Sequence, residues 1–314
     1  MKRLDFGRHM LGGFAVAALL AGCGGPSGNE VPQTAGAPSH RQRSSSATLI
    51  YAVGDNLYVL SYPNVALVST IHQQGFGICS DGVGNVWVAD AEGHQLVEYA
   101  HGGTTPIATL SDSGQYPASC SVDPSTGNLA VVNSATTGSS GTVAIYANAQ
   151  GTPSSYTDPD IYYPGYCGYD NAGNLLVDGQ SKSGTPEFAL LPTSSKSFTN
   201  ITLNKKIADG GAILWDGSYM TVQDREAGKI YRIAIAGSKG TIVGKTALTK
   251  WLTAEPTPGA WIFNGTFVAP TATRSTKIGL WAYPQGGKPT SVFSILPKHG
   301  DRFRALTLPV ASSP

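Results

Sequence analysis

Oxygen-bearing side chains recur at one point of a repeated sequence pattern, the end of a short apolar segment. Asp90 ends VWVAD, Asn133 ends LAVVN and Asp224 ends MTVQD, while Asp178 stands near the same place in LLVDG. Carboxylate and amide oxygens that converge from several loops are the ligands of Ca²⁺ and other hard divalent cations. Asp90, Asn133 and Asp224 are therefore candidate metal ligands. The competing interpretation is that each side chain caps its own turn. Beyond such a cation, we expect no cofactor.

A stretch rich in tyrosine and aspartate, YTDPDIYYPGY at residues 156–166, forms a second group. Amphipathic rings beside carboxylates can stack on a sugar or hold a peptide. The candidate ligand-binding residues are Tyr156, Asp158, Asp160, Tyr162, Tyr163 and Tyr166. The alternative is that the tyrosines cover a junction between structural units and the Asp-Pro step shapes a turn.

The sequence lacks the motifs of the common catalytic classes. It has no Gly-x-Ser-x-Gly elbow, no phosphate-cradling loop and no dinucleotide fingerprint. The histidines His72, His94, His101 and His299 are scattered and lack the spacing of a zinc site. Catalytic residues therefore stay unknown at this level, because side chains from distant segments can still meet in space.

The N-terminal segment predicts export. Lys2, Arg3 and Arg8 precede an apolar run over residues 10–21 that is too short to cross a bilayer as a helix. The run ends in Leu-Ala-Gly-Cys at 20–23, which resembles the lipobox of bacterial lipoproteins. The resemblance implies a signal peptide at 1–22, cleavage before Cys23 and lipidation of that residue. It also implies a chain anchored in the cell envelope, in the outer membrane if the cell has one.

Composition separates a tether from a folded domain. Residues 23–46 hold the lipidated cysteine and a Gly-, Pro- and Ser-rich segment without apolar periodicity, which predicts a flexible tether. Residues 47–314 form the domain. Only 13% of all residues are charged and the formal net charge is +1, so the sequence excludes a basic surface that would follow nucleic acid. We expect a monomer whose partners are the membrane, through its anchor, and an envelope protein or carbohydrate.

A fixed repeat dominates the domain. One of its segments occurs six times, as LYVLS, LVEYA, VAIYA, EFALL, IYRIA and IGLWA, and successive copies start 39 to 48 residues apart. Further strand-like segments, separated by Gly, Pro, Asn and Asp, accompany each copy. A period in the forties that contains four strands is typical of a β-propeller blade. The sequence therefore predicts an all-β, six-bladed β-propeller with four antiparallel strands per blade.

The first strand of the repeat is missing from the N-terminal copy. It occurs in phase five times, as GICSD, ASCSVD, GYCGYD, GAILWD and GAWIFN, whereas the unit that begins at Leu49 lacks it. The segment RALTLP at 304–309 is a strand without a blade. We predict that this C-terminal strand joins the N-terminal blade and closes the ring, which removes the last free sheet edges.

The best-formed copy carries a family resemblance. Gly77, Asp81, Gly84, Asn85 and Val88, followed by Asp90, match the pattern of six-bladed propellers of the NHL-repeat kind. The same hairpin position holds an acid or amide in each full copy, where a short side chain accepts hydrogen bonds from turn N–H groups. These hairpin residues are Asp81, Asp123, Asp170, Asp216 and Asn264. The resemblance implies the fold and hardly constrains function.

Three cysteines of the domain lie on the predicted innermost strands. Cys79, Cys120 and Cys167 are an odd number in an oxidising compartment, so at least one stays free or pairs outside the domain. We interpret them as buried reduced thiols that act as small apolar fillers. The alternative is that Cys79 and Cys120 face each other across one blade junction.

Two functions stay open. The first is a non-catalytic binding or scaffold module that uses the face carrying the loops after the second and fourth strands, because a rigid ring with variable loops and no catalytic motif favours binding. The alternative is a divalent-metal-dependent hydrolase or lactonase, similar to the gluconolactonase and SMP-30 propellers, that uses Asp90, Asn133 and Asp224. Whether the chain is an enzyme is therefore open, and the first function is favoured.

Overall fold

The computed structural model describes residues 48–249, 259–271, 276–295 and 303–309. The chain divides between residues 45 and 46, and every described residue belongs to the second unit. The predicted signal peptide, the lipidation site Cys23 and the tether lie outside the described residues. Among the described residues, no helix is long and apolar enough to cross a membrane.

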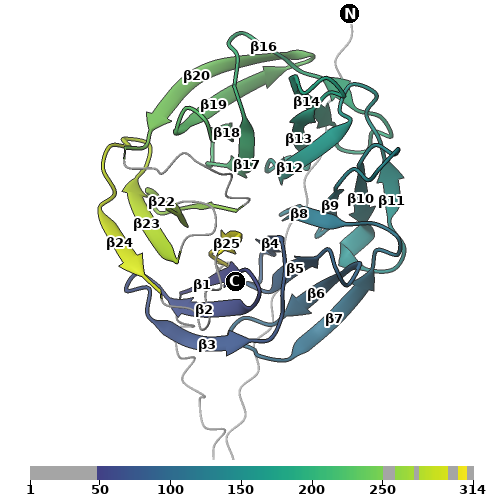
Figure 1. Ribbon diagram of the computed structural model, residues 1–314. Coiled ribbons are helices and arrows are strands. Elements are labelled where there is room, and N and C mark those ends of the chain that lie inside the picture. Colours follow the sequence, from purple (N-terminus) through teal and green to yellow (C-terminus); the bar gives the residue numbers. More distant parts are fainter. Residues whose placement is uncertain (1–47, 250–258, 272–275, 296–302, 310–314) are drawn as a thin grey trace, which may run out of the picture. The chain divides into compact units, whose positions relative to one another are not determined.

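The described chain is nearly all β, and its six sheets are arranged as a propeller around a common centre (Figure 1). Blade 1 contains β1 (Leu49–Val53), β2 (Leu57–Ser61), β3 (Leu67–Ile71) and β25 (Ala305–Thr307). Blade 2 contains β4 (Gly77–Ser80), β5 (Val86–Asp90), β6 (Gln95–Tyr99) and β7 (Pro106–Ser111). Blade 3 contains β8 (Pro117–Val122), β9 (Leu129–Asn133), β10 (Thr142–Tyr146), the 3₁₀ turn η1 (Ala147–Ala149) and β11 (Ser154–Tyr156).

The second half of the chain supplies the other three blades. Blade 4 contains β12 (Tyr163–Tyr169), β13 (Leu175–Gln180), β14 (Pro186–Leu191) and β15 (Thr199–Asn200). Blade 5 contains β16 (Thr202–Leu203), β17 (Gly210–Trp215), β18 (Met220–Asp224), β19 (Lys229–Ala236) and β20 (Lys239–Ala247). Blade 6 contains β21 (Trp261–Phe263), β22 (Thr266–Pro270), β23 (Lys277–Ala282) and β24 (Ser291–Ser294). The predicted fold class is confirmed.

The predicted ring closure is also confirmed. Strand β25 pairs antiparallel with β1, with Tyr51 opposite Thr307 and Val53 opposite Ala305. It fills the innermost position of blade 1, so the two ends of the domain share one sheet. The hydroxyl groups of Ser80 and Thr307 lie 3.2 Å apart and connect this closing strand to blade 2.

One strand departs from the predicted pattern. The repeat predicts four strands per blade, but the segment SFTNITL at residues 197–203, which follows the third strand of blade 4, divides into β15 and β16. Strand β15 pairs with β14 of blade 4, whereas β16 pairs in parallel with β20 of blade 5. Blade 5 therefore has five strands, and part of the outer edge of β20 is covered.

The recurring hairpin acids perform the predicted turn role. The carboxylate of Asp81 accepts a hydrogen bond from the N–H of Val83 at 3.0 Å. The equivalent bonds to Asp123, Asp170 and Asp216 also come from the residue two positions later, each at 2.9 Å. These bonds satisfy turn N–H groups that no strand partner reaches.

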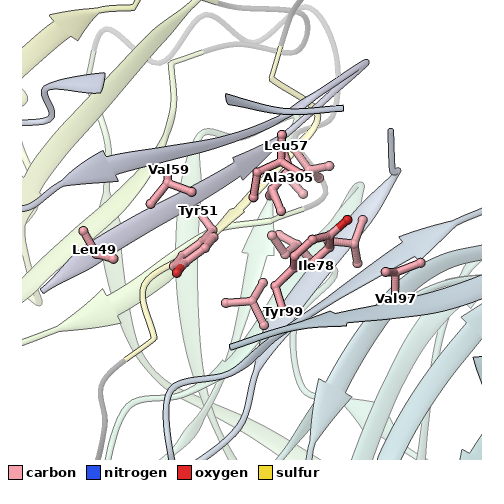
Figure 2. Packing of buried hydrophobic residues seen from close by; sticks show 12 residues of the cluster. Leu49, Tyr51, Leu57, Val59, Ile78, Val97, Tyr99 and Ala305 are labelled. Carbon is pink, nitrogen blue, oxygen red and sulfur yellow. The ribbon is translucent and has the colours of Figure 1, made fainter. Parts of the chain in front are cut away.

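Apolar side chains fill the junctions between blades. Each hydrophobic cluster among the described residues joins two neighbouring blades, and all six junctions carry one. Figure 2 shows the cluster between blades 1 and 2, in which Tyr51 and Leu57 of blade 1 face Ile78, Val97 and Tyr99 of blade 2. Because the junctions bury the apolar strand faces, the loops at both ends of the ring can vary without loss of the core.

The interpretation of all three cysteines as reduced thiols is wrong for two of them. Cys79 on β4 and Cys120 on β8 form a disulfide with Cα atoms 5.6 Å apart. The two inner strands come this close because Gly77 has no side chain: a Cβ there would lie 2.4 Å from the carbonyl oxygen of Ala118. Cys167 is free and buried, and burial raises the pKa of its thiol to about 12. All three residues line a narrow central cavity of about 70 Å³.

Candidate functional site

The loops after the second and fourth strands meet on one face of the propeller, as the sequence predicts. Asp90 ends β5, and its Oδ2 accepts hydrogen bonds from Gln95, in the same blade, and from Gln73, in the loop that enters the blade. The corresponding carboxylate of Asp224 accepts a bond from the N–H of Ala208 in the loop before β17. We call this surface the loop face.

The three candidate metal ligands lie in three different blades, and the bonds described for each go to its own blade or to the loop that enters that blade. Asp90 Oδ1 accepts from the N–H of Gly93 at 3.0 Å, and Asp224 Oδ1 accepts from the N–H of Ala227 at 3.0 Å. The amide of Asn133 donates to the hydroxyl of Thr142 at 3.3 Å. In the part of the chain that the structure describes, no three His, Cys, Asp or Glu side chains gather as a metal site would require. The carboxylate oxygens of Asp90 and Asp224 are thus engaged in turn capping, whereas Asn133 Oδ1 is buried without a hydrogen-bond partner among the described residues. Cation binding stays a prediction.

The tyrosine-rich stretch runs from the outer edge of blade 3 to the inner strand of blade 4, so its six candidate residues divide into groups. Tyr156 packs edge-on against Phe198 with ring centroids 6.5 Å apart. The carboxylate of Asp158 accepts hydrogen bonds from the N–H groups of Asp160 and Ile161. Asp160 accepts a bond from the side-chain amide of Asn200. These three residues therefore shape and cover the connection between the blades.

Tyr162 and Tyr163 form an aromatic pair at the start of β12, where the chain enters blade 4. Their ring centroids lie 4.7 Å apart in an edge-to-face arrangement, and Tyr163 is 46% exposed. The ammonium of Lys182, in the loop after β13, lies 5.4 Å from the centroid of Tyr162. We call Tyr162, Tyr163 and Lys182 the tyrosine patch. Exposed amphipathic rings with a cation beside them are suited to contact a partner molecule.

Tyr166 belongs to a separate polar cluster between blades 4 and 5. The guanidinium of Arg225, in the loop after β18, donates one hydrogen bond to the Tyr166 hydroxyl at 2.9 Å and another to the Asp209 carboxylate. The same guanidinium lies 5.4 Å from the Tyr166 ring centroid. Asp178, at the fourth position of β13, accepts a bond from the N–H of Tyr166 at 2.7 Å. We call Tyr166, Asp178, Asp209 and Arg225 the junction cluster.

Some buried polar atoms of the junction cluster lack a hydrogen-bond partner among the described residues. Asp178 is only 2% exposed, and within the described ranges neither its Oδ2 nor Arg225 Nε has a hydrogen-bond partner. Burial raises the pKa of Asp178 to about 8, against the opposing effects of the Tyr166 N–H and the Arg225 guanidinium. Near neutral pH this side chain therefore holds a proton, and it can donate a hydrogen bond as well as accept one.

Sequence reasoning missed two members of the junction cluster, Arg225 and Asp209. They lie in two separate loops of blade 5, and Arg225 is 59 positions away from its partner Tyr166. One signal was present, because Asp178 stands at the second-strand position of the repeat but is followed by Gly179 and Gln180 within the strand. That placement puts a carboxyl group inside the sheet instead of in the loop.

No protein-family model and no curated protein matches the sequence. Solved structures do match the fold. A chain of a nidogen/laminin complex aligns with a TM-score of 0.68 at 11% identity, over 85% of this chain and 100% of that one. A protein of unknown function from Bacteroides caccae aligns with a TM-score of 0.58 at 11% identity, over 84% and 99%. A streptogramin B lyase aligns with a TM-score of 0.49 at 17% identity, over 81% and 76%.

These similarities concern the fold. The alignments cover nearly the whole of the neighbouring chains and confirm the predicted resemblance to propellers of the NHL-repeat kind. The 11% identities show that this resemblance is distant. Because a propeller hosts many unrelated functions, the fold leaves the choice of function to the residues of the loop face. The chain is a β-propeller with distant propeller neighbours.

Proposed function

We propose that the chain is an exported lipoprotein whose propeller is a non-catalytic binding module for a protein or another ligand of the cell envelope. The observation that carries the proposal is the tyrosine patch on the loop face. Tyrosine is among the residues that dominate binding energies at interfaces, since its ring brings a large contact area with little loss of side-chain entropy. The exposed ring of Tyr163 and the half-buried ring of Tyr162 present that area next to the cation of Lys182.

Two further observations support the proposed location. The leader and the Leu-Ala-Gly-Cys motif at 20–23 resemble those of a lipoprotein precursor. The Cys79–Cys120 disulfide suits an oxidising compartment such as the bacterial envelope. The proposal predicts that Cys23→Ser moves the protein from the membrane fraction to the soluble fraction, whereas Cys167→Ser leaves it with the membrane.

A site-directed crosslinking experiment tests the binding role. A photo-reactive amino acid replaces Tyr163 in cells that produce the full chain, and the same amino acid replaces Val83 as a control. Val83 is 67% exposed and lies in the hairpin between β4 and β5, at the end of the ring opposite to the loop face. We expect a discrete crosslinked species from position 163 and none from position 83.

A matched substitution completes the test. Tyr162→Ala together with Tyr163→Ala removes the rings and is expected to abolish the crosslink to a probe placed at Lys182. Tyr116→Ala, which removes another exposed tyrosine that is 43% accessible, is expected to retain it. The proposal fails if the double variant crosslinks to the same species as the unaltered chain.

A further inference from the structure

A groove opens at the other end of the junction between blades 4 and 5, on the face that carries the hairpins between first and second strands. Its volume is about 500 Å³, which lies within the usual range of about 300–1,000 Å³ for small-molecule sites. Leu190, Met220 and Ile233 contribute apolar surface, and Trp215 and Tyr219 add two aromatic rings. We call it the hairpin-face groove.

The lining of the hairpin-face groove combines apolar and polar surface and carries almost no charge. Among the described residues, no Lys or Arg side chain lines it, and Asp170 supplies the one carboxylate. That carboxylate already accepts hydrogen bonds from the N–H of Ala172, the N–H of Asn174 and the side-chain amide of Asn174. An acidic ligand would therefore lose hydration without meeting an opposite charge, which disfavours it.

Several hydrogen-bonding groups in the groove are free to meet a ligand. Within the described part of the chain, the indole N–H of Trp215 and the hydroxyl of Tyr219 have no hydrogen-bond partner, and neither side chain is fully buried. Tyr219 is 36% exposed. The hydroxyls of Ser218 and Thr199 line the same space. Hydroxyl groups both donate and accept, so this set matches a ligand whose own polar groups are hydroxyls.

Trp215 also connects the groove to the centre of the ring. It lines a second depression of about 260 Å³, together with Trp261 and Tyr169, around the residues of the inner strands. The two depressions share Trp215, so aromatic side chains continue from the blade junction toward the channel. A chain of linked rings can follow such a path, with apolar ring faces on the aromatic side chains.

We propose that the hairpin-face groove is a binding site for a neutral oligosaccharide, with one sugar ring stacked on Trp215 and sugar hydroxyls bonded to the Trp215 N–H and the Tyr219 hydroxyl. This site lies apart from the tyrosine patch and extends the function proposed above. The free hydroxyl and indole groups and the aromatic rings favour a saccharide, because sugar hydroxyls can both donate to and accept from these groups and sugar ring faces can pack on the aromatic side chains.

Isothermal titration of the full chain tests this inference, in a detergent without a sugar headgroup. The probes are maltotetraose, cellotetraose and tetra-N-acetylchitotetraose, with a tetramer of galacturonic acid as the charged counterpart. We expect at least one neutral tetrasaccharide to bind and the acidic tetramer not to bind. Trp215→Ala is expected to weaken the affinity at least tenfold, and Tyr219→Ala, at an exposed position, several-fold.

Control variants separate loss of the site from loss of the fold. Trp215→Phe keeps an aromatic ring and is expected to bind within a few-fold of the unaltered chain, with an unchanged melting temperature. The Tyr162→Ala and Tyr163→Ala double variant is expected to bind the saccharide normally, so failure here is distinguishable from failure of the loop-face proposal. The inference is overturned if no neutral tetrasaccharide binds, if the acidic tetramer binds better, or if Trp215→Ala leaves the affinity unchanged.

Discussion

The junction between blades 2 and 3 and the junction between blades 4 and 5 are built on equivalent strands but are held in different ways. The first is tied by the Cys79–Cys120 disulfide, and its cluster packs Trp87, Leu129 and other apolar residues. The second brings Gly168 just as close to the backbone of Ile213, without a covalent bond. Its loop-face end buries the junction cluster, and its other end opens into the hairpin-face groove.

The difference indicates which blade junction tolerates buried groups that lower the free energy of unfolding. A buried guanidinium, a buried carboxyl group and unpaired polar atoms destabilise a junction unless they are compensated elsewhere. Blades 2 and 3 also bury polar side chains, Asp112 and Asn133, but a disulfide ties their inner strands together. Blades 4 and 5 hold a guanidinium and the carboxyl group of Asp178 without a covalent tie, and their junction opens into the hairpin-face groove. Polar groups that break the local packing rules are typical of functional sites, so the second junction, with its groove, is where we expect ligand chemistry.

We expect the largest effect on stability from removal of the Cys79–Cys120 disulfide. The disulfide spans a sequence separation of 41 residues, for which chain entropy gives a contribution of about 4 kcal/mol to the free energy of unfolding. Cys79→Ala with Cys120→Ala is therefore expected to lower the melting temperature by roughly 10 °C. A reductant should lower the melting temperature of the unaltered chain by a similar amount and should leave that of the double variant unchanged. Cys167→Ala is the control, because this cysteine is buried but free.

If this prediction fails, the contrast between a covalently held junction and a non-covalent one no longer applies. A melting temperature that neither reductant nor the double substitution changes would mean that packing alone holds blades 2 and 3. The two junctions would then differ only in the kind of polar group that each one buries, and the disulfide would not explain the rigidity of blades 2 and 3.

The second effect concerns Asp178 in the other junction. Burial raises its pKa from 3.8 to about 8, so between these pH values the folded state holds a proton that the unfolded chain has released. The free energy of unfolding therefore decreases as the pH rises through this window, by at most about 1.4 kcal/mol per pH unit. Asp178→Asn cannot release the proton, so we expect a weaker pH dependence and a higher stability than the unaltered chain at pH 8.

Denaturant unfolding from pH 4 to pH 9 measures this difference. Asp55→Asn is the control, because the Asp55 side chain is 62% exposed. Asp178→Asn and the unaltered chain should be nearly equal in stability at pH 4 and should diverge above it. Parallel curves across the whole range would show that Asp178 is ionised in the folded state, and the junction cluster would lose its protonated donor.

Much of the fold could be predicted because each strand of the repeat can be recognised from a few consecutive residues. The column from LYVLS to IGLWA locates β2, β6, β10, β14, β19 and β23, and the orphan RALTLP locates the closing strand β25. Strand β16 could not be found in this way. It has only two residues, and its partner β20 belongs to the next blade, so nothing in the local pattern assigns it.

The functional surface was less predictable because it depends on contacts between distant segments. The composition of the stretch indicates Tyr162, Tyr163 and Tyr166 as one group, whereas strand β12 places the first two in the tyrosine patch and the third in the junction cluster. Arg225 and Asp209 carry no motif and became visible only once blades 4 and 5 were side by side. The sequence leaves open that Cys79 and Cys120 face each other. Whether the inner strands come close enough for a disulfide depends on the packing of Gly77, which no local sequence pattern indicates.

The smallest effect is expected from divalent metal, and it decides whether the two junctions are independent. Asp90 and Asn133 belong to blades 2 and 3, and Asp224 belongs to blade 5, so one ion shared by all three would join both junctions into a single site. A ligand at 100 times its Kd adds about 2.7 kcal/mol, or roughly 5–10 °C in melting temperature for a domain of this size. We expect no resolvable shift when Ca²⁺, Mg²⁺, Mn²⁺ or Zn²⁺ is restored after EDTA, because loop N–H and amide groups already bind the carboxylates of Asp90 and Asp224. A shift of several degrees that Asp224→Asn removes would reinstate the metal-dependent hydrolase, and lactone and ester hydrolysis would then be the activities to measure.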